Sequence, residues 1–349
     1  MNLNPKFPLY LPGVKNTRNE NVTILGANLR EDETVLAYYV SGGEGLEMKI
    51  QKKYTTKDFP TLNEIVKLFF DENSLSQVDR FGISVPGPVL NGKSNPERLG
   101  WNLDVEDFKN EFGFKEVNML NDQEAAAYGI GLLEDSELQD IRSGGHLENG
   151  NVAIIAPGNG LGEAGYFFDG KYLRPFATEG GHSEFSPRTT IEVEFYQFLN
   201  NLYGIVSWEN VLSKAGLFNI YRFLRDVKRH PEPDGLSERL NEGNFVEVLY
   251  KAATEEDVMI CKIALDTFLE FLAREANSLT LKLKATGGLI IAGDISQVVS
   301  KYIDKDKFYE KFKISDKMEY MLRNIPIYLV KSNSTSINGI ALYTAYHQD

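Results

Sequence analysis

The hydrophobic pattern at the start of the chain is typical of short strands separated by turns. Apolar and β-branched residues cluster at Val22–Leu25, Thr34–Val40 and Met48–Tyr54, with turn residues between the clusters. We expect a turn at Gly26–Asn28, which would join the first two strands. Because strands joined by short turns pair antiparallel, the pattern predicts a sheet that opens with a β-meander.

The pattern changes after residue 60, where helical periodicity begins to alternate with short apolar runs. Apolar residues from Leu62 to Phe70 fall on one helical face. Arg80–Val85 is an apolar run that a proline ends. Val117–Leu120 is another run, and at Asn121-Asp122 it passes directly into a helical stretch. Strands that alternate with helices predict an α/β class.

The second half of the chain repeats this order. Residues 134–150 are polar and rich in turn residues, and we interpret them as a loop and a candidate boundary between two similar halves. Strands are expected at 152–156 and 164–168, and the chain is mainly helical from 190 to about 283. Two further strands and a closing helix are predicted at 289–292, 325–330 and 337–346.

Composition narrows the class of protein. The chain has 349 residues and a formal net charge of −13, with Lys and Arg scattered along it. A nucleic-acid or anionic-membrane surface needs a basic patch, so we expect no nucleic-acid and no membrane partner. The single cysteine, Cys261, excludes a disulfide within the chain, and four scattered histidines make a protein-held metal site unfavourable. Neither a signal peptide nor a spanning apolar run is present, which predicts a cytoplasmic protein.

Two places combine polar residues or glycines with the ends of predicted strands. Asp122 stands where a strand ends and a helix begins, which is where ligands bind in open α/β sheets. The alternative is that Asp122 only caps the helix. Gly158–Gly162 joins two predicted strands, and its glycines would let the backbone approach a phosphate, although a plain hairpin loop fits them as well. It is neither a P-loop nor a dinucleotide fingerprint, because no Gly-Lys-Ser/Thr follows and no helix opens there.

A third place carries ionisable groups at tight turns. Glu179-Gly180-Gly181-His182 presents a carboxylate and an imidazole where both can reach one polar ligand; a structural hydrogen bond is the alternative role for the imidazole. Glu209 begins a predicted helix, where it either complements the helix dipole or accepts hydrogen bonds from hydroxyl groups. With Asn121 and Asp122, these side chains have the chemistry that recognises sugars.

These motifs, in order, resemble the bacterial ATP-dependent glucokinases. The order and spacing match over roughly residues 80–345, and the block from Glu179 to Arg188 is its most discriminating piece. The chain lacks the Cys-rich zinc block of the related ROK sugar kinases, which favours the glucokinase branch. The other motifs that carry the resemblance are Gly87-Pro88-Val89, Leu99-Gly100-Trp101, Leu120-Asn121-Asp122-Gln123-Glu124-Ala125, Pro157-Gly158-Asn159-Gly160-Leu161-Gly162, Ser207-Trp208-Glu209-Asn210-Val211-Leu212-Ser213 and Ala292-Gly293-Asp294-Ile295.

The resemblance implies an α/β protein with the two-domain sugar kinase–actin (ribonuclease H-like) fold and an active-site cleft between the domains. We expect a small α/β domain of residues 1–133 plus 333–349 and a large α/β domain of residues 134–332. In the family, the aspartate of the Asn-Asp pair is the general base, which makes Asp122 the predicted catalytic residue. The sugar-binding residues that the resemblance implies are Asn121, Asp122, Glu179, His182 and Glu209. The nucleotide- and phosphate-binding residues that it implies are Gly26, Asn28, Gly158, Asn159, Gly160, Gly162 and Gly293.

The first phosphate loop departs from the family pattern. It is normally Asp-Ile-Gly-Gly-Thr-Asn followed shortly by Arg, and the aligned stretch here is Thr23–Arg30. Thr23, Leu25 and Ala27 replace the aspartate, a glycine and the threonine, and Asp294 stands at the usual second glycine of the adenosine motif. The family aspartate normally helps to hold the magnesium-bound phosphates, so its loss weakens charge stabilisation on the ATP side.

The resemblance implies an enzyme, an ATP-dependent glucokinase that transfers the γ-phosphate of ATP to the 6-hydroxyl of glucose. ATP with Mg²⁺ is the expected phosphoryl donor, bound transiently as a substrate, and no metal is expected to be held by the protein itself. Two alternatives remain open because of the altered first loop: a glucokinase-like sugar-binding sensor or regulator with little catalysis, and a kinase for another hexose. A homodimer is compatible with the family.

Overall fold

The computed structural model describes residues 2–3, 5–42, 45–143 and 150–348. The chain forms two compact units: Met1–Asp135 with Phe168–Ala177 and Ser332–Asp349, and Ser136–Phe167 with Thr178–Lys331. These bounds differ from the expected domains mainly in that residues 168–177 group with the first unit. Within the described ranges, no helix is both long and apolar enough to span a membrane.

The sheet of the first unit has six strands and mixes antiparallel with parallel pairing. The meander prediction is confirmed, because β2, β3 and β4 pair antiparallel; β5 and β8 then continue the sheet parallel to β2. In their order across the sheet the strands are β1 (Asn2–Leu3), β4 (Gly45–Thr55), β3 (Glu33–Gly42), β2 (Thr23–Asn28), β5 (Arg80–Val85) and β8 (Glu116–Asn121). A separate short ribbon pairs β6 (Lys93–Ser94) with β7 (Leu103–Asp104).

The predicted turn at Gly26–Asn28 is wrong. These residues are the second half of β2, and the connection to β3 is Leu29–Asp32. The strand continues because Ala27, like the residues two before and two after it, buries its side chain in the same core. Gly26 faces the other side of the sheet, where a Cβ would lie 3.2 Å from Ile337 Cδ1. A glycine is therefore used here for close packing within a strand and not for a turn.

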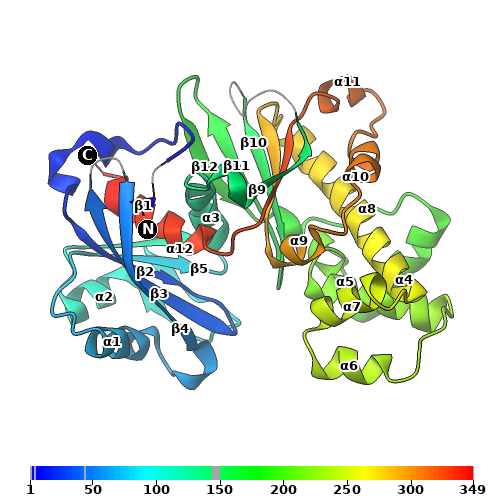
Figure 1. Ribbon diagram of the computed structural model, residues 1–349, viewed down its shortest axis with the longest axis horizontal. Coiled ribbons are helices and arrows are strands. Elements are labelled where there is room, and N and C mark those ends of the chain that lie inside the picture. Colours follow the sequence, from blue (N-terminus) through cyan, green and yellow to red (C-terminus); the bar gives the residue numbers. More distant parts are fainter. Residues whose placement is uncertain (1, 4, 43–44, 144–149, 349) are drawn as a thin grey trace. The chain divides into compact units, whose positions relative to one another are not determined.

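Helices cover both faces of this sheet (Figure 1). Phe81 and Ile83 of β5 face α1 and α2 in one apolar core, whereas Gly82 between them faces the last helix, where its Cβ would lie 3.0 Å from Ile340 O. This alternation follows from the two-residue period of a strand. The helical segments of the unit are α1 (Leu62–Glu72), α2 (Val105–Phe112), α3 (Asp122–Ile130), α12 (Thr335–Tyr346) and the short η1 (Pro12–Lys15), η2 (Thr17–Asn19) and η3 (Thr56–Asp58).

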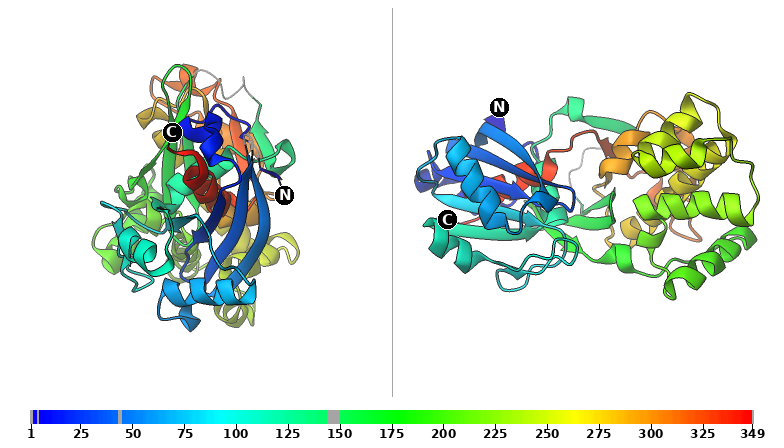
Figure 2. Two further views of the ribbon diagram at one scale, coloured as in Figure 1. Left: turned by 90° about the vertical axis from the view of Figure 1, so that its left-hand side faces the viewer. Right: turned by 90° about the horizontal axis from the view of Figure 1, so that it is seen from below.

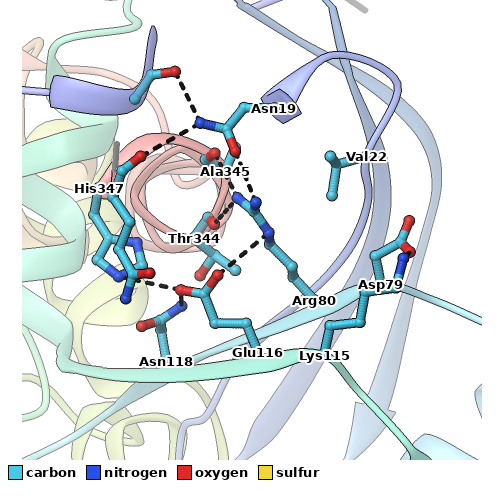
Figure 3. Close-up of polar contacts among 12 residues, drawn as sticks. Asn19, Val22, Asp79, Arg80, Lys115, Glu116, Asn118, Thr344, Ala345 and His347 are labelled. Atoms are coloured by element: carbon cyan, nitrogen blue, oxygen red, sulfur yellow. Dashed lines mark hydrogen bonds and ion pairs between the residues drawn. The ribbon is translucent and has the colours of Figure 1, made fainter. Parts of the chain in front are cut away.

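The C-terminal helix α12 is attached to the N-terminal sheet by polar contacts at its end. In Figure 2 this red helix lies against the blue strands. Figure 3 shows that Arg80 donates hydrogen bonds to the backbone oxygens of Thr344 (3.1 Å) and Ala345 (2.8 Å), which lie in the last turn of the helix. Glu116 on the neighbouring strand approaches Arg80 Nε at 3.3 Å and His347 Nε2 at 3.1 Å. These contacts join the end of α12 to the sheet of the first unit, to which residues 332–349 belong.

The other large sheet also has six strands, which belong to the second unit except that most of β12 falls within residues 168–177. β10 and β11 form an antiparallel hairpin, and β13 and β14 extend the sheet parallel to β10. In their order across the sheet the strands are β12 (Leu173–Thr178), β11 (Leu161–Phe168), β10 (Val152–Pro157), β13 (Gly288–Ile291), β14 (Ile327–Val330) and β9 (Leu138–Arg142).

The loop predicted for residues 134–150 is wrong in part, because β9 lies within it. This strand pairs antiparallel with β14 at the edge of the sheet, and its sequence Leu-Gln-Asp-Ile-Arg is polar because an edge strand is partly exposed to solvent. Only Ile141 in it is fully buried. Residues 144–149 of the predicted loop lie outside the described residues.

The predicted helical region of the second unit is confirmed. The yellow and green helices between residues 190 and 283 gather into one group in Figure 2, with the long helix α8 among them, and they share a core with the buried sheet residues Ile155 and Ile291. The helices of this unit are α4 (Thr190–Tyr203), α5 (Lys214–Arg222), α6 (Leu236–Glu242), α7 (Phe245–Thr254), α8 (Met259–Lys282), α9 (Asp294–Val299), α10 (Lys305–Phe312) and α11 (Glu319–Leu322). Shorter helical segments are η4 (Asp135–Glu137), η5 (Gly180–His182), η6 (Trp208–Asn210) and η7 (Phe223–Val227).

Candidate active site

Three neighbouring parallel strands of the first unit end at the same edge of the sheet. Asn28 at the end of β2 is in register with Ser84 in β5, and Val85 at the end of β5 is in register with Asn121 at the end of β8. Ser84 Oγ donates a hydrogen bond to Asn28 Oδ1 at 3.1 Å. The carboxyl ends of parallel strands are the usual place for a ligand in an α/β sheet. This edge is the part of the candidate site that the first unit provides.

Asn121, and not Asp122, caps helix α3. Its Oδ1 accepts hydrogen bonds from the backbone N–H groups of Gln123 (2.8 Å) and Glu124 (3.4 Å), and its Nδ2 donates to Gly87 O at 3.0 Å. Asp122 is the first residue of the helix and is half-buried. Its carboxylate therefore stands at a helix N-terminus, where the helix dipole attracts negative charge, and the capping role is already filled by its neighbour.

Of the two residues predicted to bind phosphate in the first unit, only Asn28 reaches this edge. Gly26 lies buried in the middle of β2. Thr23 begins the strand at its opposite end, where its Oγ1 donates to Asp79 Oδ2 at 2.7 Å; Asp79 also pairs with Lys115 (Figure 3). The connection that leaves the carboxyl edge of β2 is Leu29–Asp32. The alternation of apolar residues that runs through residue 29 is the sequence signal that indicates where the strand ends.

In the second unit, the glycine-rich segment is a hairpin turn between β10 and β11. Gly158 N donates to Gly160 O at 2.8 Å, and Gly158 O accepts a hydrogen bond from Lys214 N at 2.9 Å. Asn159 is half-buried at the tip. Gly162 lies inside β11, opposite Ala156, so the turn itself is shorter than the predicted loop. Binding of phosphate by this turn stays a prediction.

Glu209 is attached to this same turn. Its Oε2 accepts a hydrogen bond from Leu161 N at 3.0 Å. A Cβ at Gly160 would collide with that oxygen and would lie 3.2 Å from the Cδ of the carboxylate. The close approach of Glu209 therefore needs a glycine at position 160. This contact joins a residue that is predicted to bind the sugar to the loop that is predicted to bind phosphate.

The turn that carries Glu179 and His182 lies against the start of β11. His182 N donates to Glu179 O at 3.1 Å, and both side chains are exposed. A Cβ at Gly181 would collide with Leu161 O, so the turn packs backbone on backbone. Beyond the turn, Ser183 O accepts a hydrogen bond from Trp208 N at 2.9 Å, which brings the segment before Glu209 alongside. The structure therefore gathers Glu179, His182 and Glu209 around one strand end.

Gly293 joins this group from the other end of the sequence. It links β13 to α9 with a φ of 85°, a backbone conformation that favours glycine, and a Cβ would lie 2.8 Å from the carbonyl carbon of Ala156. It therefore lies beside the end of β10, next to the turn that begins at Gly158. Asp294 follows as the first residue of α9.

Comparison with known proteins shows to which family the chain belongs. The model of the family described as Glucokinase matches residues 32–347 of the chain. The chain belongs to the glucokinase family. A glucokinase from Nostoc punctiforme is 29% identical over 336 residues, covering 92% of this chain and 98% of that protein. The family match begins at residue 32, the last residue of the connection between β2 and β3.

Solved glucokinase structures share the fold. A glucokinase from an Antarctic psychrotroph superposes with a TM-score of 0.78 at 23% identity, covering 92% of this chain and 98% of that one. A ROK family glucokinase from Streptomyces griseus, solved in complex with glucose and AMPPNP, superposes with a TM-score of 0.62 at 16% identity, covering 91% and 98%. The predicted α/β sugar kinase–actin fold is thereby confirmed.

The most discriminating glucokinase motif is held by a buried ion pair. Arg274 on α8 donates to Glu192 Oε2 on α4 at 2.6 Å and to Ser186 O at 2.8 Å, and the same Glu192 oxygen accepts a hydrogen bond from Arg188 N at 2.7 Å. Arg274 is 5% exposed. Its guanidinium also lies 5.9 Å from the ring centre of Trp208, next to Glu209. The motif after His182 therefore has a structural partner in the core.

The site residues predicted for this glucokinase thus form two groups, one in each unit. Gly158, Asn159, Gly160, Glu179, His182, Glu209 and Gly293 come together in the second unit, and Asn28, Asn121 and Asp122 share the strand edge of the first. That the two groups line one cleft stays a prediction of the family resemblance. Within the described ranges, no cluster of three or more His, Cys, Asp or Glu side chains is arranged to hold a metal ion.

Proposed function

We propose that this chain is an ATP-dependent glucokinase in which Asp122 is the general base for the 6-hydroxyl of glucose. The observation that carries the proposal is the glucokinase family match over residues 32–347. The position of Asp122 supports its role, because this half-buried residue begins a helix at the end of a strand, directly after the capping Asn121. Phosphoryl transfer asks a protein mainly to position two substrates and to neutralise charge, and one carboxylate removes the hydroxyl proton.

The sugar side of the proposal assigns Asn121, Glu179, His182 and Glu209 to hydrogen bonds with glucose hydroxyls. Carboxylates accept such bonds, while amide and imidazole groups both accept and donate them. A ligand can reach these side chains, because Glu179 and His182 are exposed and Glu209 is half-buried. The glucose-bound neighbour from Streptomyces griseus supports glucose as the sugar.

On the ATP side we assign phosphate contacts to the Gly158–Gly160 turn and a nucleotide contact to Gly293. In place of the loop first aligned at Thr23–Arg30, we propose that the Leu29–Asp32 turn, with Asn28, approaches the phosphates from the first unit, since it leaves the carboxyl edge of β2. The AMPPNP-bound neighbour supports a nucleoside triphosphate as donor. Mg²⁺ would enter with ATP and neutralise phosphate charge there. We also propose that the protein is cytoplasmic and that it can form a homodimer.

A coupled assay with glucose and magnesium-ATP tests the function. We expect glucose-dependent ADP formation, and a loss of kcat by about 10²- to 10⁴-fold in Asp122→Asn, which keeps the shape of the side chain but removes the base. Asp71→Asn, at an exposed position in α1 of the same unit, is the control and should leave turnover unchanged.

Three results would each contradict a part of the proposal. Glucose binding by calorimetry without any ATP turnover would favour the sugar-sensing alternative. Turnover that is faster with another hexose than with glucose would favour the kinase for that sugar. Full activity in Asp122→Asn would remove the proposed base but leave the enzyme class standing.

A further inference from the structure

Two buried carboxylates in the second unit have no role in the proposed chemistry. Glu163 on β11 is 1% exposed, and Glu275 on α8 is fully buried. A buried carboxylate is costly unless it is paired or hydrogen-bonded. The nearby cation is Lys282, whose Nζ lies 3.3 Å from Glu275 Oε1 and whose side chain is half exposed. One ammonium group at the edge therefore faces two carboxyl groups.

Each of the two carboxyl groups has one oxygen that lacks a hydrogen-bond partner among the described residues. These oxygens are Glu163 Oε1 and Glu275 Oε2, and both are buried. Burial, with the neighbouring charge of Glu275, raises the pKa of the Glu163 carboxyl, and burial also raises the pKa of Glu275 despite the opposing effect of Lys282. One proton between the two groups would let one carboxyl group donate a hydrogen bond to the other and would avoid two adjacent buried charges.

The pair lies directly beneath the turn that carries Glu179 and His182. A Cβ at Gly180, the first residue of η5, would collide with Glu163 Oε2 and would lie 3.0 Å from its Cδ. Thr178 Oγ1 connects the two elements, since it donates to Glu163 O at 3.3 Å and accepts a hydrogen bond from Gly180 N at 3.1 Å. The backbone of the turn at Gly180 therefore packs directly against the Glu163 side chain, and no room is left between them for a methyl group.

We propose that Glu163 and Glu275 are a positioning pair, which shares one proton and thereby holds the Glu179–His182 turn in its sugar-binding conformation. The proposal rests on the proposed function, because it assigns glucose binding to that turn. Neither side chain touches the substrate; the pair acts through the backbone of Gly180. Loss of the shared proton would leave two like charges side by side, and the repulsion would push Glu163 against the turn.

The other charged groups around the pair do not replace the proton. Arg274 and Lys282 on α8 stabilise the ionised form of Glu275. Arg188, after the turn, also interacts electrostatically with Glu275. Arg274 is already paired with Glu192 on α4. Lys282 also favours the ionised form of Glu163, but its hydrogen bond and the charge of Arg274 act on Glu275, so Glu163 is the member that keeps the proton. Glucose affinity should then fall as the pH rises and the proton is lost, while the chemical step at Asp122 is affected less.

Glu163→Gln tests the pair, because the amide N–H supplies a permanent hydrogen bond to Glu275 that cannot be lost to base. We expect the KM for glucose of the wild-type enzyme to rise about tenfold per pH unit once the proton is lost, in measurements from about pH 6 to about pH 9. The kcat and the KM for ATP should change little over this range. In Glu163→Gln the KM for glucose should stay low and flat. Glu255→Gln, at the exposed position directly after α7, is the control and should follow the wild type.

A second variant and a second measurement keep the outcomes distinct. Glu275→Gln should also flatten the profile, and it decides the question if Glu163→Gln does not fold. Identical glucose profiles for the wild type and a folded Gln variant would overturn the proposal. Absence of glucose turnover at every pH would instead refute the proposed function. The thermal unfolding midpoint needs no substrate: it should fall with rising pH more steeply in the wild type than in Glu163→Gln, and equal slopes would show that no shared proton exists.

Discussion

Gly160→Ala adds one methyl group to the turn between β10 and β11, at the point where Glu209 lies against the backbone. The new Cβ would collide with Glu209 Oε2 and approach its Cδ to 3.2 Å. The backbone of residue 160 does not lie in the left-handed region, so alanine is tolerated by the chain itself. The carboxylate, at the end of a flexible side chain, is therefore the group that must move. Its hydrogen bond from Leu161 N would be lost with that movement.

The size of the effect follows from that hydrogen bond. A hydrogen bond to a charged group contributes about 1.5–3 kcal/mol, and the displaced carboxylate loses its fixed position for the sugar as well. At about 1.4 kcal/mol for each factor of ten, we expect glucose to bind about 10- to 100-fold more weakly to Gly160→Ala.

Calorimetric titration of glucose in the absence of nucleotide measures this directly, because any effect of the turn on ATP is then excluded. The matched control is Gly158→Ala in the same turn, since a Cβ there meets no described atom within 4 Å. We expect Gly158→Ala to bind glucose as the wild type does. In a Glu209→Ala background, which removes the carboxylate, the Gly160→Ala substitution should have no further effect on glucose binding.

Equal glucose affinities for Gly160→Ala and Gly158→Ala would refute the reasoning, because the collision would then have no consequence for the sugar. An undiminished effect of Gly160→Ala in the Glu209→Ala background would refute it in another way, by showing that the methyl group acts through a different contact.

Two further predictions concern stability. Arg274→Met leaves Glu192 buried without its cation and should lower the free energy of unfolding by about 3–5 kcal/mol in denaturant titrations, with partial recovery in Arg274→Met/Glu192→Met; a loss below about 1 kcal/mol would contradict the buried pair. Burial opposes ionisation of Asp79, but Lys115 and two hydrogen bonds from Thr23 prevail and lower its pKa to about 2, so its stabilising contribution is present above the ordinary carboxyl pKa and is lost as the pH falls toward 2. Asp79→Asn should cost roughly 2 kcal/mol at neutral pH and nothing near pH 2, and a cost that does not depend on pH would exclude the ionised carboxylate as its source.

Much of the fold could be predicted from local pattern. The meander, the helical region from residue 190 and the strand that passes into a helix at Asn121-Asp122 are all present in the structure. Each depends on a backbone period of two or 3.6 residues, which the order of apolar and polar residues records directly. The family could also be predicted, because its motifs combine residue types at fixed spacing, and the glucokinase match confirms it.

The errors lie where local pattern has two meanings. The local pattern predicts a turn at Gly26, but tertiary packing uses this residue to let α12 approach β2. The local pattern predicts a loop where strand β9 lies, because an edge strand can be as polar as a loop. In both places the sequence is the same for either structure, and only the neighbouring element decides between them.

The sequence by itself determined the class of the protein, the order of its elements and the identity of its candidate polar groups. Only the tertiary structure decided which of them act on one another. Glu209 meets Gly160 across 49 residues, and Glu163 meets Glu275 across 112 residues, separations that no periodicity describes. The physical reason is that burial and collision are properties of surfaces brought together by folding, whereas a pattern along the chain specifies only each residue's own backbone and face.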